Sequence, residues 1–160
     1  MGLTVLNILL VLFLVGFISL GFKDGLIQTF GRLVGAVIGF IAARSWSSWI
    51  SGVLAIALPM GWARFIAFVV VFGVASRVVG IVFHLVDAAL RIVTFLPFIK
   101  TVNKLLGGVL GIVEGVLMIG GVLWAISTYQ TFPAVVALIQ QSPLARLFLT
   151  GFETLLRFVM

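Results

Sequence analysis

Three charged residues stand alone inside long apolar runs of this sequence: Arg32, Arg77 and Glu114. A charge near the centre of a lipid bilayer costs about 2.5 kcal/mol or more on insertion scales, so such residues are usually paired, protonated or turned toward water inside a helix bundle. A guanidinium suits a carboxylate because it donates two parallel hydrogen bonds. Since their helices follow one another in the chain, we expect Arg77 to pair with Glu114 in a buried polar centre.

This pairing leaves Arg32 without a carboxylate. An unneutralised arginine at that depth either receives an anionic ligand, such as a phospholipid headgroup or an anionic solute, or is satisfied by backbone carbonyls and by extending toward the interface. The alternative is that the three charges only fix the packing of the helices. The sequence leaves both hypotheses open.

His84 and Asp87 extend the helical face of Arg77 toward the membrane surface, and we treat them as accessory residues of the polar centre. A lone histidine near the interface is more often a hydrogen-bonded structural residue than a proton relay. The sequence holds no cysteine, no nucleophile motif, no phosphate-binding loop and no metal-ligand spacing. We therefore expect no enzyme activity, no metal and no cofactor.

The elements that carry these residues are predicted from four apolar runs, at residues 3–22, 26–43, 62–85 and 104–126. Each is long enough to cross, with tilt or flanking residues, a hydrocarbon core about 30 Å thick. Hydrophobic residues make up 63% of the 160 positions and charged residues 9%, which excludes an ordinary soluble domain. The first run lacks the basic start and the exit of a signal peptide, so we expect a retained transmembrane helix.

The net charge of +6 comes from basic residues scattered singly along the chain. Nucleic-acid binding requires a clustered basic patch, so we expect no nucleic-acid partner. The tight corner at Lys23 and Asp24 predicts that the first two spans are antiparallel neighbours. Basic residues near the membrane weakly favour a cytoplasmic side for the connection 86–104.

Two segments lie outside the predicted spans. Residues 44–61 combine serines and tryptophans with helix breakers, which predicts an interfacial segment between the second and third spans. In the tail 129–160, Ser142 and Pro143 predict a helix start. One polar stripe then recurs at Arg146, Thr150, Glu153 and Arg157. The expected fold is therefore an all-α membrane domain of four transmembrane helices, residues 1–128, followed by an amphipathic helix that lies in the headgroup region or packs on the bundle.

Glycines recur at helical spacing on three of the predicted spans. Small residues let helix backbones approach closely in lipid, so we expect these glycines to pack helix against helix. They are Gly31, Gly35 and Gly39, then Gly73 and Gly80, then Gly107, Gly111 and Gly115. Four short helices leave little room for a transport pathway inside one copy of the chain, so we expect a homo-oligomer or a larger membrane complex.

The order of these features resembles the colicin V production protein (CvpA) family. The resemblance rests on the corner Gly21 to Gly25, the glycine-rich second span, and the opening of the last span, where Asn103 precedes Leu106-Gly107, Gly111 and Gly115. It covers residues 3–128 and implies a multi-pass protein of the bacterial inner membrane, linked to colicin V production and to envelope homeostasis or transport. Asp24 stands where an uncharged residue is more usual, and the tail after Tyr129 lies outside the resemblance.

Overall fold

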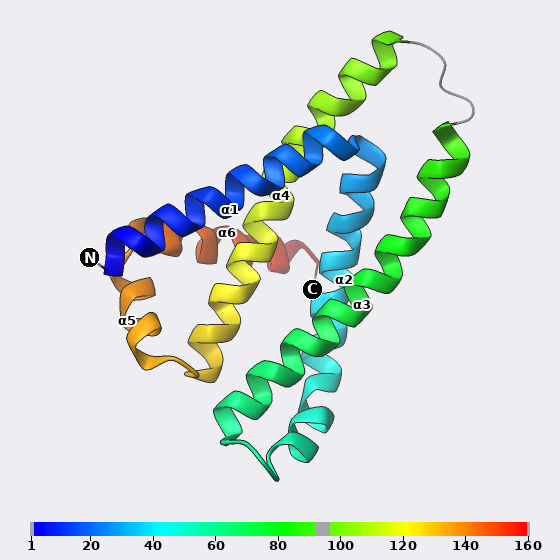
Figure 1. Ribbon diagram of the computed structural model, residues 1–160. Helices are drawn as coiled ribbons and strands as arrows, with labels where there is room; N and C mark the ends of the chain where they lie inside the picture. Colours follow the sequence, from blue (N-terminus) through cyan, green and yellow to red (C-terminus); the bar gives the residue numbers. More distant parts are fainter. Residues whose placement is uncertain (1, 92–96, 160) are drawn as a thin grey trace.

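The computed structural model describes residues 2–91 and 97–159, almost all of them in α-helices (Figure 1). The helices are α1 (Gly2–Asp24), α2 (Leu26–Leu54), α3 (Met60–Arg91), α4 (Pro97–Tyr129), α5 (Pro133–Gln141) and α6 (Pro143–Val159). By length and hydropathy, α1, α2, α3 and α4 each suffice to cross a membrane. The prediction of an all-α membrane protein with four such helices is confirmed. The pair α5 and α6, bent by 93°, passes the same test when taken together.

The helices pair in two long contacts, α2 with α3 and α1 with α4 (Figure 1). α1 and α2 contact each other only sparsely, although a single residue, Gly25, connects them. The expectation that they are close antiparallel neighbours is therefore wrong. Glycines on α4 draw α1 to that helix, while a separate stripe on α2 draws in α3.

The contact between α2 and α3 follows small residues at four-residue spacing along α2. They are all buried: Gly31, Gly35, Gly39, Ala43, Ser47 and Ser51. On the facing helix, Ala63 and Ala67 are fully buried. Because none of these side chains is large, the two backbones approach closely over most of their length.

This stripe explains why α2 runs past the predicted end of the second span at Ala43. The helix continues to Leu54, since Ser47 and Ser51 keep a small, buried face toward protein while Trp46 and Trp49 point outward, 67% and 87% exposed. Most of the segment expected to be interfacial is therefore helical. The break comes later, at residues 55–59.

The start of α4 also differs from the expected one. The helix begins at Pro97, where the fixed φ of proline suits the first helical position, and not near Asn103. Asn103 consequently lies inside α4 and its side chain is free to reach another element.

The helix expected at Pro143 is present, and it packs on the bundle. Ser142 Oγ accepts a hydrogen bond from the Ala145 N–H at 3.0 Å and donates one to Asn7 Oδ1 of α1 at 2.6 Å. Phe148, Phe152 and Leu156 of α6 are buried, whereas Arg146 and Glu153 are exposed. The helix is thus amphipathic, with its apolar face against α4.

Candidate functional site

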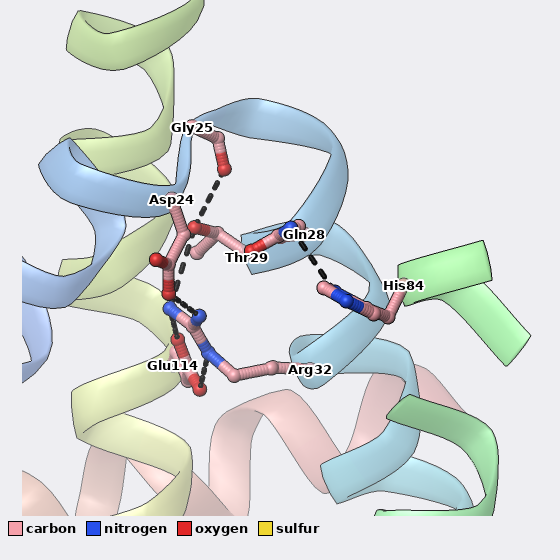
Figure 2. A network of polar contacts seen from close by, with 7 residues as sticks. All are labelled: Asp24, Gly25, Gln28, Thr29, Arg32, His84 and Glu114. Carbon is pink, nitrogen blue, oxygen red and sulfur yellow. Dashed lines mark hydrogen bonds and ion pairs between the residues drawn. The ribbon is translucent and has the colours of Figure 1, made fainter. Parts of the chain in front are cut away.

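The polar centre of the bundle is built around Arg32 of α2 (Figure 2). Its Nε donates to Glu114 Oε1 at 2.8 Å and its Nη2 donates to Glu114 Oε2 at 3.1 Å. Nη1 binds the carboxylate of Asp24, and Nη2 also lies 3.4 Å from the hydroxyl of Thr29. One guanidinium therefore joins α2 to the end of α1 and to the middle of α4.

Glu114 is 3% exposed, so its carboxylate is removed from solvent and lipid alike. A side-on guanidinium neutralises a buried carboxylate well because both oxygens accept hydrogen bonds in one plane. Asp24 adds a second carboxylate on the remaining nitrogen. The name "arginine cluster" is used below for Asp24, Arg32 and Glu114.

The backbone that positions the arginine cluster turns at Gly25, whose φ is +84°. Only glycine adopts this region without strain, and an added Cβ would also collide with Asn103. Asn103 Oδ1 in turn accepts the Leu26 N–H at 3.0 Å, which caps the start of α2 from the side of α4. The Gly25 carbonyl accepts the hydroxyl of Thr29 at 2.8 Å, the residue that also faces Arg32.

A close contact between α1 and α4 holds the other side of the arginine cluster. Gly107 and Gly111 are buried, and a Cβ at Gly111 would lie 2.6 Å from the Phe17 carbonyl oxygen of α1. Gly115 faces Leu14 and Phe17 in the same contact. These glycines let α1 lie directly on α4, which brings Asp24 and Glu114 to one guanidinium.

The predicted pair between Arg77 and Glu114 is wrong, because both oxygens of Glu114 are bound by Arg32. Arg77 is exposed and forms no hydrogen bond or ion pair with any residue in the described part of the chain. The arginine left over is therefore Arg77, where the sequence predicted Arg32. The physical reason is that α3 packs along α2 and contacts α4 only sparsely, so Arg77 faces a gap.

That gap is a cavity of about 500 Å³, here named the polar cavity, between α2, α3 and α4. Arg32 and Glu114 form part of its wall and Arg77 another part. The three predicted charges therefore share one cavity, although only two of them touch. The polar residues that line it are Gln28, Arg32, Ser76, Arg77, His84 and Glu114.

His84 lines the polar cavity near its edge, and its Nδ1 lies 3.2 Å from Gln28 Nε2 (Figure 2). The hydrogen bond ties the later part of α3 to the first turn of α2. Asp87, the other accessory residue, lies outside the part of the chain whose side chains are described.

The glycines predicted to pack helices divide into two groups. A Cβ at Gly31 would collide with Phe83, and one at Gly35 or Gly39 would meet α3 at Ser76 or Phe72, so these three lie in a helix contact like the glycines of α4. Gly73 and Gly80 differ, because a Cβ there meets no atom within 4 Å. The prediction that these two glycines pack against another helix of the chain is therefore wrong. They line the polar cavity beside Arg77 instead.

Sequence reasoning missed Gln28, Thr29 and Ser76 of the site, and it gave Asp24 and Asn103 other places. Asp24 was assigned only to a turn, although a carboxylate just before a helix that carries an arginine two turns later was an available signal. The sequence placed Asn103 only at the opening of the last span, and in the structure its side chain caps α2. Among the described residues, no group of three or more His, Cys, Asp or Glu side chains is placed to hold a metal ion.

The fold and the site define a class, a multi-pass helical membrane protein with charged residues clustered between its spans. A family model described as "Colicin V production protein" matches residues 6–152. The chain therefore belongs to the colicin V production protein family. This match includes α5 and the first part of α6, which the resemblance seen in the sequence did not cover. Comparisons with curated proteins and with solved structures return no match.

Proposed function

We propose that this protein is a non-enzymatic component of the bacterial inner membrane that acts in envelope homeostasis or transport by binding an anionic group at Arg77. The observation that carries the proposal is the placement of that residue. Arg77 lines the polar cavity and has no hydrogen-bonding or ionic partner among the described residues.

The depth of Arg77 makes the missing partner significant. Leu85 is the last residue of the third span predicted from the sequence, so at about 1.5 Å per residue Arg77 lies roughly 12 Å inside that span. A cation at this depth is costly unless it is neutralised or hydrated. A phosphate or carboxylate in the polar cavity would supply the neutralising charge, and the planar guanidinium suits two oxygens of such a group.

The arginine cluster favours the second candidate function, a structural or assembly subunit of a larger membrane complex. Each of the three guanidinium nitrogens of Arg32 has a carboxylate partner within the chain. Nothing further is needed to satisfy Arg32, so its role is to hold α1, α2 and α4 together. The two arginines thus support different hypotheses, and ligand binding rests on Arg77 alone.

Substitution of Arg77 by Gln tests the proposed function, with Arg64→Gln as the matched control. Arg64 lies on the same helix, is exposed, and does not line the polar cavity. In a strain lacking its own family member, we expect Arg77→Gln to reach normal membrane abundance yet fail to restore the envelope phenotype, while Arg64→Gln restores it. Full restoration of the envelope phenotype by Arg77→Gln would refute the proposal. A loss of the variant protein from the membrane would show that Arg77 has a structural role.

Binding is measured on detergent-purified protein by calorimetric titration with a water-soluble, short-chain phosphatidylglycerol. A charge-assisted pair contributes about 1.5 to 3 kcal/mol, so we expect the dissociation constant of Arg77→Gln to rise by at least about tenfold. Arg64→Gln should bind like the unaltered protein. Equal binding by all three proteins would exclude Arg77 as the anion site.

A further inference from the structure

A second cavity adjoins the polar one and differs from it in chemistry. This apolar cavity, of about 450 Å³, lies between α2, α3 and α4 and is closed by α6. Phe40, Phe68 and Phe152 line it, and all the other lining residues are apolar or glycine. Because Phe152 and Leu156 belong to α6, the docking of that helix completes the wall.

The two cavities share walls on all three helices. Ala36 of α2, Phe72 and Gly73 of α3, and Met118 of α4 line both of them. No added Cβ at Gly73 would meet another atom, so the junction at this position is open. The two adjoining cavities are together called the compartment, with the charged and polar side chains at one end and apolar residues at the other.

The order along the helices places the polar end nearer the membrane surface. Gln28 precedes Phe40 on α2, and His84 follows Phe68 on α3, so in both antiparallel helices the polar residues lie toward the connection 86–104. A lipid of the leaflet on that side has the same order, with its headgroup outward and its chains toward the bilayer centre.

The compartment also opens laterally. Val69 of α3 and Val122 of α4 line the apolar cavity and are 45% and 48% exposed. Ile81 and Arg77 line the polar cavity and are exposed as well. In a membrane, such an edge between α3 and α4 faces lipid, so an acyl chain can enter without crossing the bundle.

The polar end suits one negative charge. Arg77 supplies a cation with no partner among the described residues, and the imidazole of His84 and the amide of Gln28 lie in the same wall. Glu114 is the only carboxylate among the described residues that line the polar cavity, and both of its oxygens already accept hydrogen bonds from Arg32. Arg32 offsets the charge of Glu114, although Asp24, which is not among the described lining residues, leaves the arginine cluster with one net negative charge.

We infer that the compartment binds a single anionic phospholipid of the surrounding bilayer, with the phosphate at Arg77 and one acyl chain in the apolar cavity. The inference rests on the proposed function and adds to it the ligand class and the entry route between α3 and α4. A water-soluble anion uses only the polar end, whereas the phospholipid uses both ends at once.

Gly73→Leu separates the inference from the proposed function, because its side chain projects into the junction between the cavities while Arg77 itself is unchanged. Gly16→Leu is the matched control, since Gly16 of α1 is also exposed with no atom within 4 Å of an added Cβ. Binding of long-chain and short-chain phosphatidylglycerol is compared by native mass spectrometry on the full-length protein. Gel filtration and thermal unfolding confirm that each variant is folded, and Gly73→Ala serves as the milder substitution.

We expect the unaltered protein and Gly16→Leu to prefer the long-chain lipid over the short-chain one, and Gly73→Leu to lose that preference by about tenfold or more. Arg77→Gln should weaken the binding of both the long-chain and the short-chain lipid. A long-chain preference that survives in folded Gly73→Leu and Gly73→Ala would overturn the inference and leave the proposed function standing. Unchanged binding of both lipids by Arg77→Gln would overturn both. Equal affinity for long-chain phosphatidylglycerol and for an uncharged diacylglycerol would do the same.

Discussion

Glu114 binds the guanidinium of Arg32 through both carboxylate oxygens, at 2.8 and 3.1 Å, although the two residues lie 82 positions apart. The contact joins the middle of α4 to the first part of α2, and Asp24 extends it to the end of α1. One arginine therefore links three of the spans, α1, α2 and α4. This relationship underlies the first two predictions.

The ion pair between Arg32 and Glu114 should be strongly coupled. Removing one partner of a buried pair costs about 3 to 5 kcal/mol because the other charge is left uncompensated. We expect Arg32→Gln to lower the free energy of unfolding by an amount in this range, and Glu114→Gln to lower it less, because Asp24 still neutralises Arg32. The double variant should lose less than the sum of the two, by a coupling of about 0.5 to 3 kcal/mol. Reversible unfolding in mixed micelles measures this cycle, and strictly additive losses would contradict the pairing.

Arg77→Gln should behave quite differently in the same assay. The side chain has no hydrogen-bonding or ionic partner among the described residues, so we expect the free energy of unfolding to change by no more than about 0.5 kcal/mol. A loss as large as that of Arg32→Gln would show that Arg77 holds the bundle together. Comparison of the two arginine variants therefore separates the structural arginine from the binding one.

Gly111→Ala should loosen the contact between α1 and α4. An added Cβ at this position would lie 2.6 Å from the Phe17 carbonyl oxygen and 3.1 Å from the Cα of Ile18, and backbone atoms cannot move aside cheaply. Overpacking of this kind costs about 1 to 3 kcal/mol. Gly16→Ala on the facing helix is the control, since its Cβ meets nothing within 4 Å. Thermal unfolding of the two variants tests the prediction, which fails if Gly111→Ala is as stable as Gly16→Ala.

Asn103→Ala should destabilise the start of α2. The Leu26 N–H would lose its acceptor, and loss of a capping side chain costs about 0.5 to 2 kcal/mol. Asn103→Asp retains an acceptor oxygen and places a negative charge at the helix N-terminus, so we expect it to keep most of the stability. Amide hydrogen exchange at Leu26 reports the local effect. Equal protection in both variants would mean that the side chain is not a cap.

Sequence reasoning was most successful where local chemistry decides the outcome. Ser142 and Pro143 begin α6 as expected, because a hydroxyl that accepts the Ala145 N–H and a proline with fixed φ act within a few residues. It was least successful where local signals compete. The serines and tryptophans after Ala43 indicated an interface, yet the small-residue face of α2 continues through Ser51 and carries the helix onward.

The amino-acid sequence by itself determined the spans, the helical faces and the presence of three charges at membrane depth, because hydropathy and the period of about 3.6 residues per turn depend on nearby residues only. Tertiary structure alone decided which arginine meets Glu114. That choice depends on which helices share a close contact, and here α3 lies along α2 while α1 lies along α4. Arg32 is thereby carried to the two carboxylates, whereas Arg77 is left at the wall of a cavity that no periodicity in the sequence reveals.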